Sequence, residues 1–392
     1  MKLMSIAGAR PNFMKLAAIA RAVERFNEEE TARSQIKTSR IEHIIVHTGQ
    51  HYDQKMSGGF FTDLGIPEPQ VNLGVGSASH AVQTAEIMKR FEPVLMRELP
   101  DVLLVVGDVN STVACALVAA KAEYPTGYGI RRPLIAHVEA GLRSFDRNMP
   151  EEINRILTDA LSDLLFVTEE SGIENLMNEG AAEEKIHFVG NVMIDTLEQH
   201  LDEASQSLIK EQLGIKGKYC LVTLHRPSNV DRYGGLKPLV DCLMKISERI
   251  EMVFPVHPRT NQRLREFNLL KCMEKNARIV LADPLSYLDF LHLTNDASIV
   301  VTDSGGIQEE TTYLQVPCIT LRDNTERPVT VSSGSNYLVG TNPENIIATV
   351  IRVLNGHGKE ARIPERWDGK AGQRIIDIIA NRTGSYPRRA RV

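Results

Sequence analysis

Cysteine is scarce in this sequence and never has the paired spacing of a metal-binding or redox motif. Five cysteines are spread over 392 residues, at positions 115, 220, 242, 272 and 318, and no two form a CxxC pair. A disulfide framework or a zinc site is therefore not expected, and free thiols in a reducing cytoplasm are the simplest interpretation. No group of His, Asp and Glu residues has a convincing ligand spacing, so we predict no structural or catalytic metal.

Long apolar runs and a strong charge imbalance are also missing. No stretch approaches the length of about 18 uncharged apolar residues that a membrane-spanning helix needs. The first residues, MKLMSIAGARPN, hold too short an apolar core for a signal peptide. The net charge of −5 and the pI near 6.2 leave no basic footprint for nucleic acid. We therefore expect a cytoplasmic protein that binds neither a membrane nor a nucleic acid.

Two common nucleotide-binding motifs are absent. The loop after the first apolar run, GARPNFMK, lacks the GxGxxG spacing of a dinucleotide site, which disfavours a nicotinamide-dependent enzyme. The sequence also contains no GxxxxGK[ST], which excludes a P-loop kinase.

The sequence contains instead a regular alternation of short apolar runs with amphipathic stretches. This alternation occurs twice, on either side of a polar, strand-poor region at 195–218. Repeated strand–helix–strand units predict a doubly wound parallel sheet, so we expect an α/β protein with two Rossmann-like domains, 1–192 and 193–368. The expected strands are 3–7, 44–47, 102–106, 134–138 and 164–167, followed by 220–224, 252–256, 279–282, 299–302 and 318–321.

Doubly wound sheets bind ligands beyond the carboxyl ends of their strands, which directs attention to the loops there. The loop TDSGGIQEE ends an apolar run and opens a helix, so Ser304, Gly305 and Gly306 can present free N–H groups to a diphosphate. Either Glu309 or Glu310 could accept hydrogen bonds from ribose hydroxyls. A capped helix start without a ligand is the alternative interpretation.

Acidic residues follow two strands of the first half and open a helix. Asp108 stands in GDVNST, Glu139 in HVEAGLRS, and Glu151 in PEEINR, with Arg155 one helical turn after Glu151. Each acid could merely cap a helix or favour its dipole. Together, carboxylates at one sheet edge are typical of acid–base catalysis.

Cationic loops follow strands in both halves. Arg10 and Lys15 flank Pro11 in the first loop and could reach a phosphate. In the second half, His225 and His257 each stand beside an arginine directly after a strand, an arrangement that suits a polyanion. Arg327 lies in the charged loop RDNTERP after the last expected strand, where a lid or a sugar contact is plausible.

In this order and spacing, nine motifs resemble the non-hydrolysing UDP-N-acetylglucosamine 2-epimerases. They are GARPNFMK, HTGQH, GDVNST, HVEAGLRS, PEEINR, LHRPSN, PVHPRT, TDSGGIQEE and RDNTERP, and they extend from the first strand to about residue 340. The resemblance implies a GT-B fold with UDP-sugar in a central cleft, no cofactor, and a homodimer. It also implies that the last helix, in 369–392, returns to the first domain.

The resemblance further implies the reaction and the role of each candidate residue. The family interconverts UDP-GlcNAc and UDP-ManNAc by eliminating UDP to a 2-acetamidoglucal and adding it back. Asp108, Glu139 and Glu151 would be the acid–base groups, and His225 would stand by the leaving phosphate. The residues that would bind the UDP-sugar are Arg10, Lys15, Ser304, Gly305 and Gly306 at the phosphates, Glu310 at the ribose, Phe290 at the uracil, Arg155 and Arg327 at the sugar, and His257 in its loop.

Several departures from the family pattern keep alternatives open. Gln50 and His51 match a second UDP-GlcNAc site of many bacterial members, but Ser77 and Ala78 replace its Arg-Gln pair. The first loop begins GARP, as in epimerases of UDP-2,3-diacetamido-glucuronate, so that sugar is an alternative substrate. A GT-B glycosyltransferase, a hydrolysing epimerase and a non-catalytic UDP-sugar-binding regulator are further alternatives.

Overall fold

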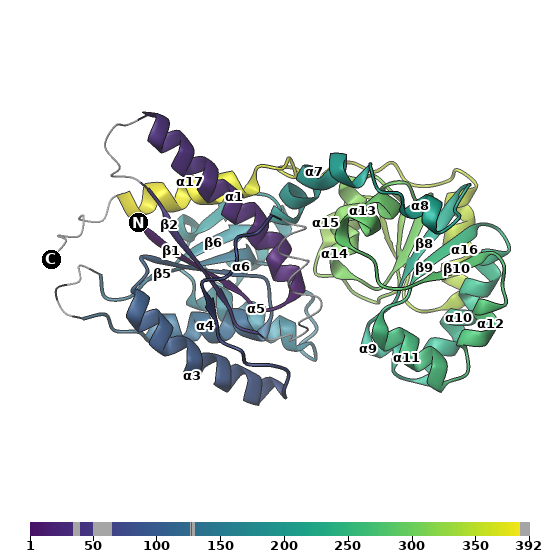
Figure 1. The fold of residues 1–392 in the computed structure, drawn as a ribbon, viewed down its shortest axis with the longest axis horizontal. Helices are drawn as coiled ribbons and strands as arrows, with labels where there is room; N and C mark the ends of the chain where they lie inside the picture. Colours follow the sequence, from purple (N-terminus) through teal and green to yellow (C-terminus); the bar gives the residue numbers. More distant parts are fainter. Residues whose placement is uncertain (34–39, 50–64, 126, 128–129, 385–392) are drawn as a thin grey trace. The chain divides into compact units, whose positions relative to one another are not determined.

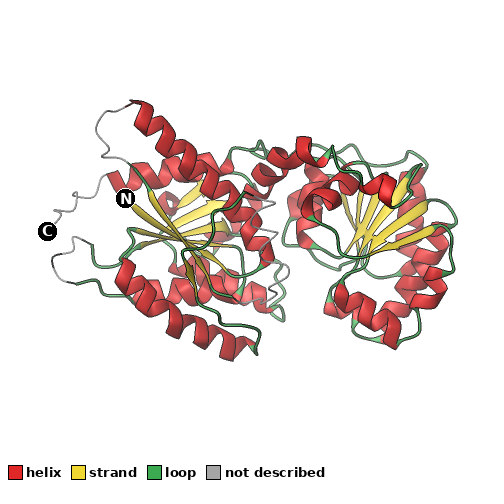
Figure 2. Cartoon of the chain, in the orientation of Figure 1, coloured by secondary structure: helices red, strands yellow, loops and turns green. Residues whose placement is uncertain are grey.

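The computed structural model describes residues 1–33, 40–49, 65–125, 127 and 130–384. The chain divides into two compact units: unit 1 is Met1–Thr196 with the segment from Glu365 onward, and unit 2 is Leu197–Pro364. Each unit has a parallel β-sheet with helices on both of its faces (Figure 1; Figure 2). The expected α/β class with two Rossmann-like sheets is thus confirmed.

Unit 1 has a seven-stranded sheet in the order β3-β2-β1-β4-β5-β6-β7, and every neighbouring pair is parallel. Its strands are β1 (Lys2–Ala7), β2 (Glu42–His47), β3 (Val71–Asn72), β4 (Val102–Val106), β5 (Leu134–Ala140), β6 (Leu164–Val167) and β7 (Ile186–Phe188). Its helices are α1 (Arg10–Arg33), α3 (His80–Glu98), α4 (Asn110–Lys121), α5 (Pro150–Leu161), α6 (Glu170–Asn178), η1 (Glu183–Lys185), the first part of α7 (Val192–Ala204), and α17 (Ala371–Gly384).

Unit 2 has a six-stranded parallel sheet in the order β10-β9-β8-β11-β12-β13. Its strands are β8 (Tyr219–Thr223), β9 (Glu251–Pro255), β10 (Ile279–Ala282), β11 (Ile299–Thr302), β12 (Cys318–Thr320) and β13 (Asn336–Leu338). Its helices are α8 (Ile209–Gln212), α9 (Pro227–Val230), α10 (Tyr233–Ser247), α11 (Pro258–Glu266), α12 (Leu270–Glu274), α13 (Tyr287–Asn295), α14 (Gly305–Tyr313), α15 (Pro328–Ser332) and α16 (Pro343–Leu354).

Ten of the strands were expected from the sequence, and their ends differ from the expected ones by two residues at most. The three that were missed, β3, β7 and β13, each lie at an edge of a sheet. They are only two or three residues long and read VN, IHF and NYL. Protein covers an edge strand less completely than a central one, so an edge strand need not be apolar at every position. The sequence pattern that identifies the central strands is therefore missing from the edge strands.

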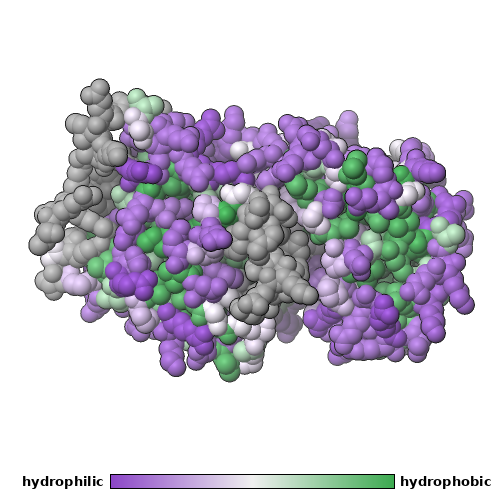
Figure 3. Space-filling view, in the orientation of Figure 1, coloured by the Kyte–Doolittle hydropathy of each residue, from purple (hydrophilic) through white to green (hydrophobic). Residues whose placement is uncertain are grey.

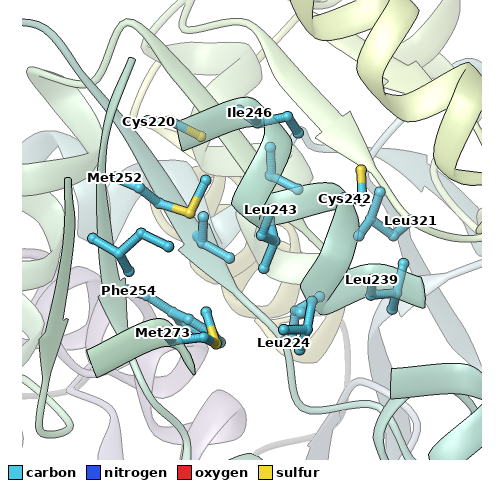
Figure 4. Close-up of a cluster of buried hydrophobic side chains, with 14 of the residues drawn as sticks. Cys220, Leu224, Leu239, Cys242, Leu243, Ile246, Met252, Phe254, Met273 and Leu321 are labelled. Atoms are coloured by element: carbon cyan, nitrogen blue, oxygen red, sulfur yellow. The ribbon is translucent and has the colours of Figure 1, made fainter. Parts of the chain in front are cut away.

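Successive residues of a strand pack against opposite helical layers, as the pleat of a strand requires. In unit 2, Cys220 belongs to the core beneath α10, whereas the next residue, Leu221, belongs to a second core with Leu293 of α13. Figure 4 shows the first of these cores, to which Leu243 of α10 and Phe254 of β9 both belong. This two-sided burial explains why the central strands are apolar at every position.

The helix α17 belongs to unit 1 although it follows unit 2 in the sequence. It packs along α1 (Figure 1). At its start, the carboxylate of Asp195 accepts hydrogen bonds from the backbone N–H of Ala371 at 3.1 Å and of Gly372 at 2.7 Å. Just before it, Trp367 is buried and donates its indole N–H to the carbonyl of Thr168 at 3.1 Å.

Hydrophilic side chains cover most of the face drawn in Figure 3, with apolar side chains scattered between them. Among the described residues, no helix has both the length and the apolar character that crossing a bilayer requires.

Candidate active site

In unit 1, the carboxyl ends of β1, β4 and β5 bring three of the predicted loops to one edge of the sheet. Val106 of β4 lies beside Val138 of β5, and β1 pairs with β4 on the other side. Gly107 and Asp108 follow β4 directly, and Glu139 is the last residue but one of β5, at the same edge. The sequence motifs GARPN, GDVNST and HVEAGLRS therefore meet there.

Glu139 is held in an uncommon backbone conformation beside Lys15. Its φ is +75°, in the left-handed region that non-glycine residues rarely adopt, and the pairing of β5 with β6 shifts register between Val138 and Ala140. Its Oε2 accepts a hydrogen bond from the Lys15 ammonium, and both side chains are buried. Such strain persists where the surroundings enforce it, often at functional sites.

Gly107 leaves the room that this ion pair occupies. A methyl group at Gly107 would lie 3.0 Å from the Nζ of Lys15 and 3.1 Å from the Oε2 of Glu139. The residue also has a φ of +66°. Glycine is therefore needed here for both space and backbone conformation.

Asp108 is fixed by Arg155 of α5. Its Oδ2 accepts hydrogen bonds from the Nη2 of Arg155 at 2.7 Å and from the Nε at 3.0 Å. The Nη1 of the same guanidinium donates to the Oε2 of Glu152 at 2.5 Å. Arg155 and Glu152 are buried, whereas the Asp108 side chain keeps 28% of its surface exposed. Asp108 thus combines a fixed orientation with access to a ligand.

The two adjacent acids at the start of α5 have different environments. Glu152 is buried and accepts hydrogen bonds from the backbone N–H of Ser144 and Phe145. Glu151, the predicted acid–base residue, is half-buried in the same first turn and lies off the buried face of the helix. The sequence motifs alone predict no role for Glu152. Its spacing of three residues from Arg155 on a helix is the signal that links the two.

In unit 2, Asp303 organises the loop that carries His225. The fully buried Asp303 carboxylate accepts hydrogen bonds from the backbone N–H of His225 at 3.0 Å and of Arg226 at 3.0 Å. It also lies 3.0 Å from the Nδ1 of His225. Burial would raise the pKa of Asp303, but its bonds to His225 and to the backbone outweigh that effect and lower it. The ring of His225 stays partly exposed, with its centroid 5.6 Å from that of His257.

The start of α14 has the features of an anion site. Ser304 occupies the N-cap position, but its side chain makes no capping hydrogen bond. A methyl group at Gly305 would lie 2.9 Å from Glu326 and 3.0 Å from the guanidinium of Arg327, whereas one at Gly306 would meet nothing within 4 Å. A ligand can therefore approach the N–H groups of this helix end closely.

Arg327 and the two acids of α14 share one buried region. The Nε of Arg327 lies 2.7 Å from the Oε1 of Glu309, and its Nη1 donates to Glu326. Glu310 is buried, and its Oε2 makes no hydrogen bond within the described residues. Burial, and next the charge of Glu309, raise the pKa of Glu310 to about 8. The carboxyl of Glu310 is thus poised to gain hydrogen-bond donors from a ligand.

The remaining predicted residues have simpler settings. Phe290 is half-buried on α13 against the apolar core of that helix layer, and His257 caps α11. Arg10 begins α1, but its side chain lies outside the described residues, as do Gln50 and His51. Within the described residues, no three His, Cys, Asp or Glu side chains are grouped to hold a metal ion.

The sequence matches the model of one protein family over residues 34–380, that of UDP-N-acetylglucosamine 2-epimerase. The UDP-N-acetylglucosamine 2-epimerase of Methanocaldococcus jannaschii is 44% identical over 386 residues, which cover 97% of this chain and 99% of that protein. The UDP-2,3-diacetamido-2,3-dideoxy-D-glucuronate 2-epimerase of Pseudomonas aeruginosa is 38% identical over 385 residues, or 97% of this chain and 99% of that protein.

Solved structures agree with these relatives. The crystal structure of the M. jannaschii UDP-GlcNAc 2-epimerase, in complex with UDP-GlcNAc and UDP, matches with a TM-score of 0.84 at 43% identity. The match covers 97% of this chain and 100% of that one. The two parallel-sheet units are therefore of the GT-B type, as expected.

Proposed function

The chain belongs to the UDP-N-acetylglucosamine 2-epimerase family of isomerases, and from that premise we propose that it interconverts UDP-GlcNAc and UDP-ManNAc. The observation that carries the proposal is the pair of acids at the ends of adjacent strands. Glu139 is bonded to Lys15 and Asp108 to Arg155, in a chain 44% identical to a named epimerase. Inversion at C2 needs groups that can remove and return a proton, and these two carboxylates suit that task.

The proposed reaction is an elimination followed by an addition. A carboxylate removes the proton from C2, the C1–O bond to UDP breaks, and a C1–C2 double bond forms in a 2-acetamidoglucal. UDP then adds back to C1 while a proton is delivered to the other face of C2. No electrons leave the substrate overall, so the reaction needs no redox cofactor.

Unit 1 is proposed to supply the acid–base groups. Asp108, Glu139 and Glu151 are the candidates, and Arg155 orients Asp108 through two hydrogen bonds to one oxygen. Lys15 was expected to hold a phosphate, but its bond to Glu139 supports a different role. We propose that Lys15 keeps the Glu139 carboxylate paired inside a buried site.

Unit 2 is proposed to hold the UDP group. The diphosphate gains negative charge as it leaves, so fixed donors and cations near it lower the barrier. The start of α14 with Ser304, Gly305 and Gly306 would bind the phosphates, and His225 would face the departing oxygen. Because Asp303 bonds the Nδ1 of His225, its Nε2 is left for this contact.

We propose the nucleoside and sugar contacts in unit 2 from the family membership together with the contacts that these residues make. Glu310 would accept hydrogen bonds from the ribose, Phe290 would pack on the uracil, and Arg327 would support the sugar. The buried Oε2 of Glu310, which makes no hydrogen bond within the described residues, supports the ribose contact. His257, close to the His225 ring, would extend the cationic side of the phosphate site.

One alternative sugar has a specific observation in its favour. A relative that is 38% identical over nearly the whole chain is named as an epimerase of UDP-2,3-diacetamido-2,3-dideoxy-D-glucuronate. Both sugars would need the same proton transfers at C2, so the acids of unit 1 do not distinguish them. An assay of both sugars does.

Proton NMR of the purified protein in D₂O tests the proposal directly. With UDP-GlcNAc we expect UDP-ManNAc that carries deuterium at C2, because the proton returned to C2 comes from solvent. The same result with the diacetamido sugar alone would reassign the substrate. Accumulation of free UDP and ManNAc would identify a hydrolysing epimerase. Binding of UDP-GlcNAc without any C2 exchange in either sugar would contradict the epimerase proposal and favour a transferase or a regulator.

Two further properties are proposed from the family membership. We propose a homodimer, which sedimentation of the purified protein would test. We also propose a cytoplasmic location, supported by five cysteines that are all free.

A further inference from the structure

A buried ion-pair network lies behind the acids of unit 1 and was not identified from the sequence. At its centre is Asp159, near the end of α5. Its Oδ1 lies 2.6 Å from the Nδ1 of His137, and its Oδ2 accepts hydrogen bonds from the backbone N–H of Gly141 at 3.1 Å and from the Nη2 of Arg143 at 2.7 Å. Arg143 also pairs with Glu179. His137, Asp159 and Arg143 expose almost nothing to solvent.

These contacts bracket Glu139. His137 precedes Glu139 by two residues and Gly141 follows it by two, and both are bonded to the same carboxylate. The residue between them is the one with the left-handed backbone at φ +75°. Asp159 thus holds both flanks of the irregular end of β5, so that the Glu139 side chain is directed to Lys15.

The other nitrogen of His137 reaches the neighbouring acid loop. Its Nε2 lies 2.8 Å from the carbonyl oxygen of Gly107, the residue immediately before Asp108. Both ring nitrogens of His137 therefore face acceptors, the Asp159 carboxylate and the Gly107 carbonyl. Through these two contacts, one buried side chain ties the Glu139 strand to the Asp108 loop.

The charges of this network stabilise one another. Burial would raise the pKa of Asp159, but the ion pairs with His137 and then Arg143 outweigh it and lower the pKa. Because these three side chains are covered by protein, they can act on a substrate only through the residues they hold.

From this geometry we propose that the Asp159–His137 pair is a positioning device that sets the relative placement of Glu139 and Asp108 for proton transfer at C2. The inference rests on the proposed function. It assigns no substrate contact to either residue. Small displacements of a reacting group can cost about 10²-fold in rate, so such a device is kinetically important.

The test compares two acid-to-amide substitutions that touch the same arginine. Asp159→Asn leaves one acceptor oxygen for three donors, whereas Glu179→Gln alters only the partly exposed partner of Arg143 and leaves His137 and Gly141 bonded. We expect Asp159→Asn to lower kcat about tenfold or more with little change in KM. UDP affinity, measured by calorimetry, should stay unchanged, and Glu179→Gln should resemble the wild type.

A second readout separates misplacement from a loss of folded enzyme. In D₂O, we would measure the ratio of deuterium in recovered substrate to epimer formed. Loss of folded protein scales both rates equally, but displacement of one acid relative to the other changes the ratio. An Asp159→Asn protein with wild-type kcat and ratio would overturn the inference. If that variant does not fold, His137→Gln is judged by the same ratio. A wild type inactive on both sugars overturns the proposed function itself.

Discussion

The Oδ2 of Asp108 accepts two hydrogen bonds from Arg155, one from Nη2 at 2.7 Å and one from Nε at 3.0 Å. Both donors converge on a single oxygen, and the Asp108 side chain keeps 28% of its surface exposed. Arg155 is itself held by Glu152. An acid with one fixed oxygen and partial exposure is well arranged to exchange a proton with a ligand.

Asp108→Asn should therefore bind UDP like the wild type. Its kcat should fall by a factor of about 10² or more, because an amide cannot take or return the proton. A matched control is Asp163→Asn. Asp163 is also bonded by one arginine, Arg132, at 2.7 and 3.0 Å, but it stands before β6 at the amino end of its strand. We expect the control to keep its activity. Equal rates in the wild type and Asp108→Asn, measured by NMR, would remove Asp108 from the mechanism.

The buried pair of Lys15 and Glu139 leads to a prediction about stability. Lys15→Met takes the cation away from a buried carboxylate, and removing one partner of a buried ion pair costs about 3–5 kcal/mol. We expect a loss of that size in the free energy of unfolding, measured by denaturant titration, together with a fall in kcat. Arg131→Met, which breaks an exposed pair with Glu123, should cost about 1 kcal/mol or less. Equal losses in the two variants would show that the Lys15 pair contributes no more than a surface contact.

Most of the fold was predictable because each central strand can be recognised from its own short stretch of sequence. A central parallel strand is covered on both faces, so its sequence is apolar at every position, as in the VLLVV of β4. The short edge strands have no such apolar pattern, and β3 consists of Val71 and Asn72 only. The loops of the site could also be found, because parallel strands place their carboxyl ends at one edge.

The partners of the site residues were harder to predict because they are distant in sequence. Lys15 and Glu139 are separated by 124 positions, and no motif in the sequence links them. Asp159 lies on a helix, 18 positions from the Gly141 N–H that it binds. The buried stripe of Glu152, Arg155 and Asp159 on α5 follows helical spacing, but the sequence does not say which groups that stripe will meet.

His225 is predicted to act on the leaving group. His225→Ala should raise the activation barrier by about 2–4 kcal/mol if the ring stabilises the departing diphosphate. The measurement is the ratio of kcat values at saturating substrate. His292→Ala, which removes a histidine beside Asp296 on α13, serves as the control and should be close to the wild type. An unchanged kcat in His225→Ala would indicate that the ring only supports its loop.

We expect the ionisation of Glu310 to make the stability of the folded protein depend on pH. Its pKa in the folded protein is about 8, raised by burial from an ordinary value of 4.5. The folded state therefore binds this proton more tightly than the unfolded state. Its contribution to stability is fully present below pH 4.5 and is lost as the pH rises toward 8. Glu310→Gln, which cannot ionise, should flatten this decline and be more stable than the wild type above pH 8 in thermal unfolding scans. The exposed Glu274→Gln should leave the decline in place, and a decline equally steep in Glu310→Gln would exclude Glu310 as its source.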